Sequence, residues 1–192
     1  VRQRTRNHKE ASAALSETEA SLGQEEIVGR ARRVRLVITD NDGVLTDAGV
    51  YYSERGEELK RYSLRDGAGI VRLRAAGIPT VVLTGEIGGA ALGRARKLEI
   101  AIYQGITDKA AEFHRILQEQ GVDASAVAYI GDDYNDLGIM DLVNASGLTA
   151  APADAMPLVL DRALFHCKAS GGQGAFREFA EFILRHRNPD SA

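Results

Sequence analysis

The sequence predicts an α/β fold, a doubly wound parallel sheet in a single domain. Short apolar runs rich in β-branched residues alternate with amphipathic segments of about ten residues, as strands joined by crossover helices do. The chain has 192 residues, of which 44% are hydrophobic and 27% charged, which suffices for one domain with a buried core. We expect this domain at 34–187, with an arm at 1–33 and a tail at 188–192.

The composition argues against several classes of protein. The formal net charge of -3 leaves no overall basic field, so we expect no nucleic-acid partner. One cysteine, Cys167, leaves no internal disulfide and fits a reducing cytoplasm. No apolar run approaches the ~20 residues that span a bilayer, and the N-terminus lacks the apolar stretch of a signal peptide. We therefore expect a soluble, cytoplasmic protein with no membrane partner.

Residues 1–33 differ in character from the rest of the chain. A basic stretch is followed by a segment rich in Ala, Ser and Glu. This composition predicts a marginal, solvent-exposed helix with fraying ends. The alternative is an arm that docks on a partner subunit.

The predicted domain begins with two buried strands that flank a hairpin and a helix. The apolar run 36–38, which ends at Asp40, predicts a buried parallel strand. Two runs around a turn over 50–62 predict a β-hairpin. Apolar residues at helical spacing predict a helix over 66–76, and 79–83 predicts the next buried strand.

The same alternation continues to the C-terminus. The expected helices are 89–98, 109–120, 135–143 and 176–187, and the expected strands are 100–103, 127–130 and 147–149.

Polar side chains follow four of the predicted strands. In chain order they are Asp40 and Asp42, then Thr84, then Lys109, then Asp132, Asp133 and Asp136. Ligands of such sheets bind at the carboxyl ends of the strands, so one crevice would gather these groups. Each residue alone is common as a helix cap, a turn residue or a solvated helix start. Their joint occurrence, in order, at consecutive strand ends favours a functional site.

This set of residues suits phosphoryl transfer. The carboxylates would repel one another without a cation, and Mg²⁺ is the usual ion where a phosphate supplies further ligands. Lys109 and the Thr84 hydroxyl are suited to phosphate oxygens, and an Asp carboxylate can accept a phosphoryl group. Asp42 lies two residues past Asp40, which puts both side chains on one side of an extended chain. The residues therefore predict magnesium-dependent phosphoryl transfer in which an Asp carboxylate can serve as the acceptor.

Two other patterns carry less weight. The glycine-rich run 171–174 is similar to a phosphate-binding loop, but the predicted elements place no strand before it and no Lys-Ser/Thr follows it. The histidines show no metal-ligand spacing, and we expect surface or packing roles for them. They are His8, His114, His166 and His186.

The motifs together carry a family resemblance. The runs Asp40–Asp47, Thr84–Gly85 and Gly131–Asp133, with Lys109, resemble the four motifs of the haloacid dehalogenase (HAD) superfamily. Within it, the chain resembles the capless branch that includes the 3-deoxy-D-manno-octulosonate (KDO) 8-phosphate phosphatases. The runs that support this narrower resemblance are 56–60, 65–67, 103–105 and 171–178. The resemblance covers about 34–187 and implies a HAD-like Rossmannoid sheet with a β-hairpin flap and no cap domain.

The resemblance implies a role for each catalytic residue. Asp40 would attack phosphorus and also ligate Mg²⁺. Asp42 would protonate the leaving oxygen and then activate water, while its backbone carbonyl ligates the metal. Thr84 and Lys109 would hold the transferring phosphoryl group.

The resemblance also implies the rest of the metal site and an assembly. Asp132 would complete the metal ligands, with Asp133 and Asp136 contacting metal-bound water or the ligands themselves. Relatives form homotetramers in which the hairpin after Asp47 helps to cover a neighbour's site. The segment Gly171–Arg177 would reach across similarly, or it is a plain loop before the last helix.

The substrate implied is a sugar acid phosphate. The candidate binding residues are Gly85, Glu86, Arg94, Lys97 and Arg65. The octulosonate enzymes usually have Arg where this chain has Glu86, which together with Arg94 and Lys97 is similar to the 2-keto-3-deoxy-D-glycero-D-galacto-nononate (KDN) 9-phosphate phosphatases. The run 65–67 is closer to the octulosonate enzymes. KDO 8-phosphate is the expected substrate, and KDN 9-phosphate is the alternative.

Two other classes of protein fit these residues less well. A phospho-accepting receiver has an acidic pocket, a Thr and a Lys on a parallel sheet, but its phosphoacceptor ends a middle strand. Here we expect the middle strand to end in Thr84, and the run 131–133 has no place in the receiver pattern. A non-catalytic assembly subunit is disfavoured, because every residue expected for the chemistry is present in this chain.

Overall fold

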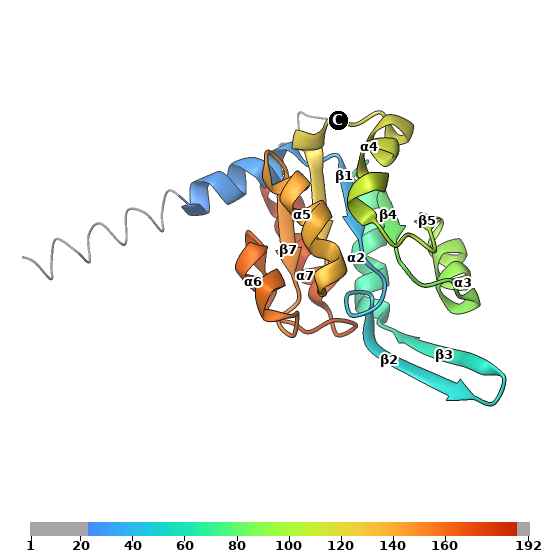
Figure 1. Ribbon diagram of the computed structural model, residues 1–192. Helices are drawn as coiled ribbons and strands as arrows, with labels where there is room; N and C mark the ends of the chain where they lie inside the picture. Colours follow the sequence, from blue (N-terminus) through green and yellow to red (C-terminus); the bar gives the residue numbers. More distant parts are fainter. Residues whose placement is uncertain (1–22, 188–192) are drawn as a thin grey trace, which may run out of the picture.

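Strand β1 (Leu36–Thr39) lies in the middle of a six-stranded parallel sheet in the computed structural model, which describes residues 23–187 (Figure 1). The order across the sheet is β5-β4-β1-β6-β7-β8, and every neighbouring pair is parallel. The other strands are β4 (Thr80–Leu83), β5 (Ala101–Tyr103), β6 (Val127–Ile130), β7 (Leu148–Ala151) and β8 (Phe165–His166). The doubly wound fold is therefore confirmed. The chain winds in opposite directions from β1, so the crevice at its carboxyl end is the expected ligand site.

The position of β1 corrects one expectation. β4, which precedes Thr84, lies second from an edge, whereas β1 and β6 are the two central strands. The expectation that the middle strand ends in Thr84 is wrong. The place of the phosphoacceptor in the sheet does not distinguish this chain from a receiver, and the discrimination rests on the run 131–133.

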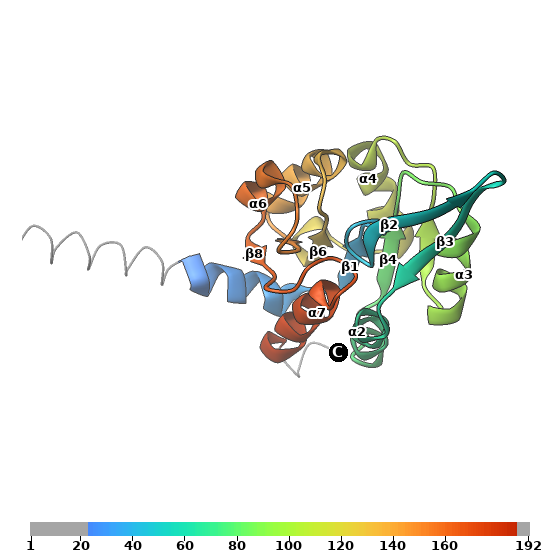
Figure 2. The same cartoon turned by 90° about the horizontal axis from the view of Figure 1, so that it is seen from below.

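Helices cover both faces of the sheet. Seen from below, α2 and α7 lie on one side and α4, α5 and α6 on the other, with α3 beside α2 (Figure 2). Their bounds are α2 (Leu64–Ala75), α3 (Gly89–Leu98), α4 (Lys109–Gln120), α5 (Leu137–Asn144), α6 (Pro157–Arg162) and α7 (Ala175–His186). Two short 3₁₀ helices, Ala124–Ala126 and Tyr134–Asp136, precede β6 and α5. The sequence missed α6 and β8 because both are too short to show a period.

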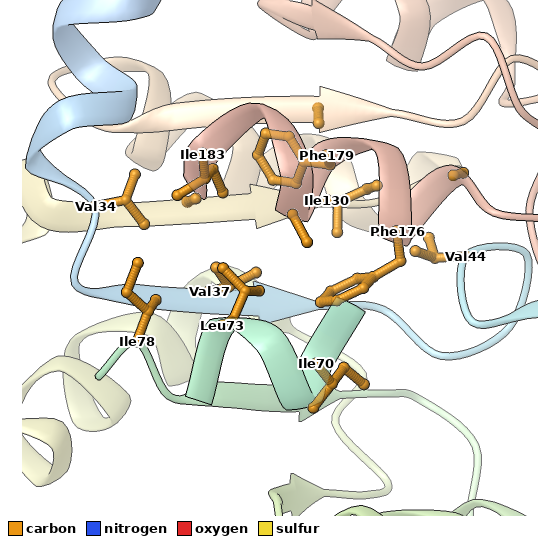
Figure 3. Close-up of a cluster of buried hydrophobic side chains, with 14 of the residues drawn as sticks. Val34, Val37, Val44, Ile70, Leu73, Ile78, Ile130, Phe176, Phe179 and Ile183 are labelled. Atoms are coloured by element: carbon orange, nitrogen blue, oxygen red, sulfur yellow. The ribbon is translucent and has the colours of Figure 1, made fainter. Parts of the chain in front are cut away.

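The core has two layers because alternate strand residues face opposite sides. Figure 3 shows Val37 and Ile130 of the sheet facing Leu73 of α2 and Phe176 and Phe179 of α7. The opposite face of the sheet packs on α4 and α5. The buried residues of this second layer come from the sheet and from these two helices, and they include Leu36, Ile38, Val81, Tyr129, Phe113, Ile116 and Met140. Both faces of the central strands are buried, which explains their nearly continuous apolar sequence.

A two-stranded hairpin, β2 (Thr46–Ser53) and β3 (Gly56–Tyr62), projects away from the sheet in both views (Figures 1 and 2). It starts four residues before the predicted position, and its first residue, Thr46, pairs with Tyr62. The register shifts between Thr46 and Val50, where Ala48 has a positive φ of 57°. This bulge separates Thr46 from the regular part of the hairpin, which was predicted to begin at residue 50.

Part of the predicted arm packs on the domain. Residues 23–33 form a helix, and Ala31 and Val34 are buried in the core. The Arg30 guanidinium donates to the carbonyls of Asn144 and Gly147 at 2.7 and 2.6 Å. The expectations for 1–22 and 188–192 fall outside the described residues. None of the helices within 23–187 is long and apolar enough to cross a membrane.

Candidate active site

Asp40 lies in the crevice at the carboxyl end of β1. Its backbone N–H donates to the Ile130 carbonyl at 3.0 Å, which continues the β1–β6 pairing by one residue. Its side chain accepts from the Asn41 backbone N–H at 2.7 Å and is 5% exposed. Burial, and then the charge of Asp136, raise the pKa of Asp40 to about 7. The carboxyl group is fixed in place but costly to ionise without a cation.

Lys109 supplies one cation. Asp108 caps α4 by accepting from the Ala111 N–H, so Lys109 is the first helical residue and its side chain lies at the site. Its ammonium is fully buried and lies 3.0 Å from Asp40 Oδ2 and 2.6 Å from Asp136 Oδ1. Burial alone would lower the pKa of Lys109, but Asp40 and Asp136 outweigh it and raise the pKa. Lys109 therefore stays charged.

Asp136 anchors this arrangement. One carboxylate oxygen accepts from Lys109 and from the Tyr129 hydroxyl, and the other accepts from the backbone N–H groups of Asp132 and Asp133 at 2.8 and 3.1 Å. Carboxylate oxygens of Asp40, Asp132 and Asp136 lie within 4.8 Å of one another. Because Asp136 already accepts four donors, Asp40 and Asp132 are better placed to ligate an ion.

Asp132 has the environment of a metal ligand. Its Oδ1 is buried with no hydrogen-bond partner among residues 23–187. Burial, and then Asp40, raise its pKa to about 8. Gly43, with a φ of 85°, lies against this carboxylate, and a Cβ added there would be 1.9 Å from Asp132 Oδ2. The glycine is required both for its backbone conformation and for this close approach.

A pocket of about 210 Å³ opens onto these groups. Its lining includes seven residues predicted for the site: Asp40, Asp42, Thr84, Gly85, Glu86, Asp132 and Asp133. Thr84 is buried at the end of β4, and its Oγ1 accepts from the Glu86 N–H at 3.2 Å. Lys109 and Asp136 lie directly beneath, in contact with Asp40 or its neighbours. The structure therefore brings together every residue predicted for catalysis and metal binding.

The three basic residues predicted for substrate binding lie outside this pocket. The Arg94 guanidinium donates to the Ser63 carbonyl at 3.0 Å and lies over the Tyr62 ring. Lys97 is exposed on α3, and Arg65 lines a separate hollow beside the glycine-rich run. None of the three lines the pocket that contains Asp40.

Lys60 is a residue that sequence reasoning overlooked. Its ammonium lies 2.8 Å from Asp42 Oδ1 and 3.5 Å from Glu57 Oε2, and its side chain is only 3% exposed. Burial would lower the pKa of Lys60, but these two carboxylates raise it. The sequence carried a signal, because Lys60 ends the run 56–60 that supports the family resemblance. The alternation of side chains along a β-hairpin could not show that the Lys60 side chain faces the site.

The glycine-rich segment contacts its own catalytic loop. The Gly172 N–H donates to the Val44 carbonyl at 2.9 Å, and a Cβ on Gly171 would be 1.8 Å from the Gly43 carbonyl oxygen. Asp66 of α2 holds the far end of this segment by accepting from the N–H groups of Gly174 and Arg177. Gly171 and Gly172 therefore support the loop after Asp40 within their own chain. The short strand β8 precedes the segment, contrary to expectation, but no Lys-Ser/Thr follows.

Comparison with known proteins places this geometry in a family. The chain is 40% identical over 161 residues to the 3-deoxy-D-manno-octulosonate 8-phosphate phosphatase KdsC of Yersinia pestis, covering 83% of this chain and 84% of that protein. The phosphatase of the same name from Moraxella catarrhalis, solved with magnesium, phosphate and KDO, superposes with a TM-score of 0.80 at 31% identity, covering 85% and 92% of the two chains.

A HAD superfamily (subfamily III A) hydrolase from Legionella pneumophila superposes with a TM-score of 0.83 at 32% identity, covering 89% of this chain and 93% of that one. No family model matches the chain. Identity at this level over more than four fifths of both chains, with the acidic pocket at the end of β1, confirms the resemblance seen in the motifs. The chain belongs to the 3-deoxy-D-manno-octulosonate 8-phosphate phosphatase family of the HAD superfamily.

Proposed function

We propose that this protein is a magnesium-dependent phosphatase that hydrolyses KDO 8-phosphate through an aspartyl-phosphate on Asp40. The observation that carries the proposal is the position of the Asp40 carboxylate. It lines an open pocket, with Lys109 3.0 Å away and, nearby, Asp132 Oδ1, which has no hydrogen-bond partner within 23–187. A nucleophile, a fixed cation and a vacant oxygen ligand thus meet at one point.

The residues present fit a magnesium ion. Asp132 Oδ1 is a buried oxygen without a hydrogen-bond partner among residues 23–187, and Mg²⁺ prefers such oxygens. Asp40 and Asp132, with the backbone carbonyl of Asp42, would hold the ion. When bound, it would neutralise charge on the phosphoryl oxygens. Asp136 would orient the loop that carries Asp132, through the two N–H groups that it accepts.

The remaining residues supply positioning and proton transfer. Lys109 and the Thr84 hydroxyl would hold the phosphoryl oxygens while Asp40 attacks phosphorus in line with the leaving oxygen. Asp42 would give a proton to the departing sugar oxygen. It would then take a proton from the water that attacks the aspartyl-phosphate, which regenerates Asp40.

The substrate assignment comes from the relatives. The Yersinia and Moraxella proteins are KDO 8-phosphate phosphatases, and the Moraxella structure contains KDO. Glu86 lines the pocket of this chain, where it would face a bound sugar acid. If Glu86 selects the sugar, Glu86→Arg should change the ratio of kcat/KM for KDO 8-phosphate and KDN 9-phosphate. An unchanged ratio would show that this position does not choose the substrate.

The homotetramer remains part of the proposal. It is supported by the family and by the exposed aromatic residues of the hairpin, Tyr51 and Tyr52, which are 64% and 71% exposed. Arg65, Arg94 and Lys97 would then contact substrate only through a neighbour's site or after rearrangement. A cytoplasmic location is supported by the single cysteine, which is buried and free.

The test is phosphate release from KDO 8-phosphate with and without Mg²⁺. We expect metal-dependent turnover that excess chelator and Asp40→Asn each abolish. Full activity of Asp40→Asn, or of the wild-type protein in chelator, would contradict the mechanism. KDN 9-phosphate assayed alongside distinguishes the two substrates.

A further inference from the structure

Lys60 is a buried lysine on a projecting hairpin. Its neighbours in the strand, Leu59 and Arg61, are exposed, whereas the Lys60 side chain is 3% exposed. A lysine at a surface normally keeps its ammonium in water, because removing the charge from water is costly. The two carboxylates that surround Lys60, on Asp42 and Glu57, offset that cost. Asp42 is also the proposed general acid and base of the reaction.

Because of this contact, the two oxygens of the Asp42 carboxylate have different surroundings. Oδ1 lies 2.8 Å from the Lys60 ammonium and 3.4 Å from the Thr46 hydroxyl. Oδ2 has no hydrogen-bond partner among the described residues, and Asp42 lines the pocket. Lys60 thus fixes the rotation of the carboxyl group and leaves Oδ2, which is buried beside the pocket, as the oxygen without a donor.

The backbone of the hairpin makes this contact possible. Lys60 pairs with Val50 on one side of the bulge, and Tyr62 pairs with Thr46 on the other. The Tyr62 hydroxyl donates to Asn41 Oδ1 at 3.1 Å, so β3 contacts the catalytic loop at two points. A shift of β3 would therefore alter the contact between Lys60 and the Asp42 carboxylate.

We propose that Lys60 is a positioning residue that aims Asp42 at the leaving oxygen of the substrate, an inference that rests on the proposed phosphatase function. In the first step, the bond between Asp40 and phosphorus forms and the bond between phosphorus and the sugar oxygen breaks. The proton of the Asp42 carboxyl group moves to that oxygen, so a sugar alcohol leaves rather than an alkoxide. The need for this proton depends on the leaving group: an alkoxide requires it, and p-nitrophenolate does not.

The test compares two substrates in one variant. In Lys60→Met, we expect kcat/KM for KDO 8-phosphate to fall by about 10²-fold, a typical contribution of a general acid. The value for p-nitrophenyl phosphate should fall less than about 3-fold. kcat/KM reports the steps up to departure of the alcohol, so hydrolysis of the aspartyl-phosphate does not enter the comparison. Because the ratio is internal to each preparation, partial misfolding does not change it.

Two further variants complete the design. Lys60→Arg keeps the cation, and its ratio between the two substrates should stay close to the wild-type ratio even if Lys60→Met cannot be produced. Arg55→Met removes an 81% exposed cation from the turn of the same hairpin, and both substrates should be unaffected. Equal losses on both substrates in Lys60→Met, no loss on either, or a ratio in Lys60→Arg changed more than about 10-fold would overturn the inference. Absence of wild-type turnover of KDO 8-phosphate would instead contradict the proposed function.

Discussion

At the scale of single residues, the site depends on one carboxylate that need not touch the substrate. Asp136 is fully buried and accepts from Lys109, from Tyr129 and from two backbone N–H groups. It thereby fixes both the cation beside Asp40 and the loop that carries Asp132. Its role follows from its neighbours in space, which come from α4, β6 and the turn before α5.

Asp136→Ala should therefore destabilise the protein as well as reduce its activity. Removing one partner of a buried ion pair leaves Lys109 with a single carboxylate, and we expect the free energy of unfolding to fall by about 3 kcal/mol. Urea denaturation followed by circular dichroism measures the change. Asp141→Ala is the matched control, because Asp141 pairs with Arg162 at the surface and should matter by less than about 1 kcal/mol. Similar losses in the two variants would contradict this role of Asp136.

The two carboxyl groups of raised pKa predict a pH dependence. Asp40 and Asp132 shift from 3.8 to about 7 and about 8, so without metal the folded protein binds more protons than the unfolded chain. Its free energy of unfolding should then fall as pH rises from about 4 to about 8. Mg²⁺ binds the ionised carboxylates of Asp40 and Asp132 and therefore competes with protons for these groups. Its effect on Tm should therefore be larger at pH 8.5 than at pH 6.

Differential scanning fluorimetry with and without Mg²⁺ at the two pH values measures this effect. Asp132→Asn is the control and should lose most of the response at pH 8.5. An equal shift of Tm at both pH values, or an undiminished response of Asp132→Asn, would show that these carboxyl groups do not bind the ion.

At the scale of elements, the catalytic loop is held by a segment more than one hundred residues away in the sequence. Gly172 donates to Val44, Gly171 lies against Gly43, and the following turn is held by Asp66 of α2. Helices α2 and α7 pack against each other over the same face of the sheet. The position of the loop after Asp40 is thus set by this pair of helices as well as by β1.

Gly171→Ala should displace the loop after Asp40. The added Cβ would lie 1.8 Å from the Gly43 carbonyl oxygen, and no side-chain rotation can relieve a contact between backbone and Cβ. We expect at least about a 10-fold loss of kcat/KM, because a small misplacement near the chemistry is costly. Gly93→Ala on α3 is the control, since nothing lies within 4 Å of its Cβ and alanine favours the helix. Wild-type activity of Gly171→Ala would show that the loop tolerates this contact.

At the scale of the whole molecule, the hairpin is the part that its own domain does not cover. It projects beyond the sheet, and Tyr51, Tyr52 and Leu59 are each more than 60% exposed (Figures 1 and 2). Large exposed apolar groups that lie close together mark interaction surfaces. The same hairpin carries Lys60, so an assembly that holds the hairpin would also hold Asp42.

Replacing Tyr51 and Tyr52 with Ser should weaken the proposed tetramer. The loss of two large apolar side chains at an interface removes burial that drives association. Light scattering coupled to size-exclusion chromatography would show smaller species, and the activity on KDO 8-phosphate should fall with them. Leu158→Ser, at a 54% exposed residue of α6, is the control and should leave the mass unchanged. A double variant that keeps the wild-type mass would place the interface elsewhere.

The sequence by itself determined the fold class and five of the six strands of the sheet, because buried parallel strands are marked by short β-branched runs and their ends by polar residues. It also predicted the candidate site, since Asp40, Thr84, Lys109 and Asp132 each follow a strand and the carboxyl ends of parallel strands meet at one edge of the sheet. Only the tertiary structure decided that β1 is central, that Asp136 anchors Lys109, that Lys60 contacts Asp42, and that Gly171 and Gly172 support the catalytic loop. These contacts join segments distant in the chain, and no local period encodes them. For the same reason, the sequence could not show that Arg94 and Lys97, which share a helix face, lie outside the pocket of their own chain.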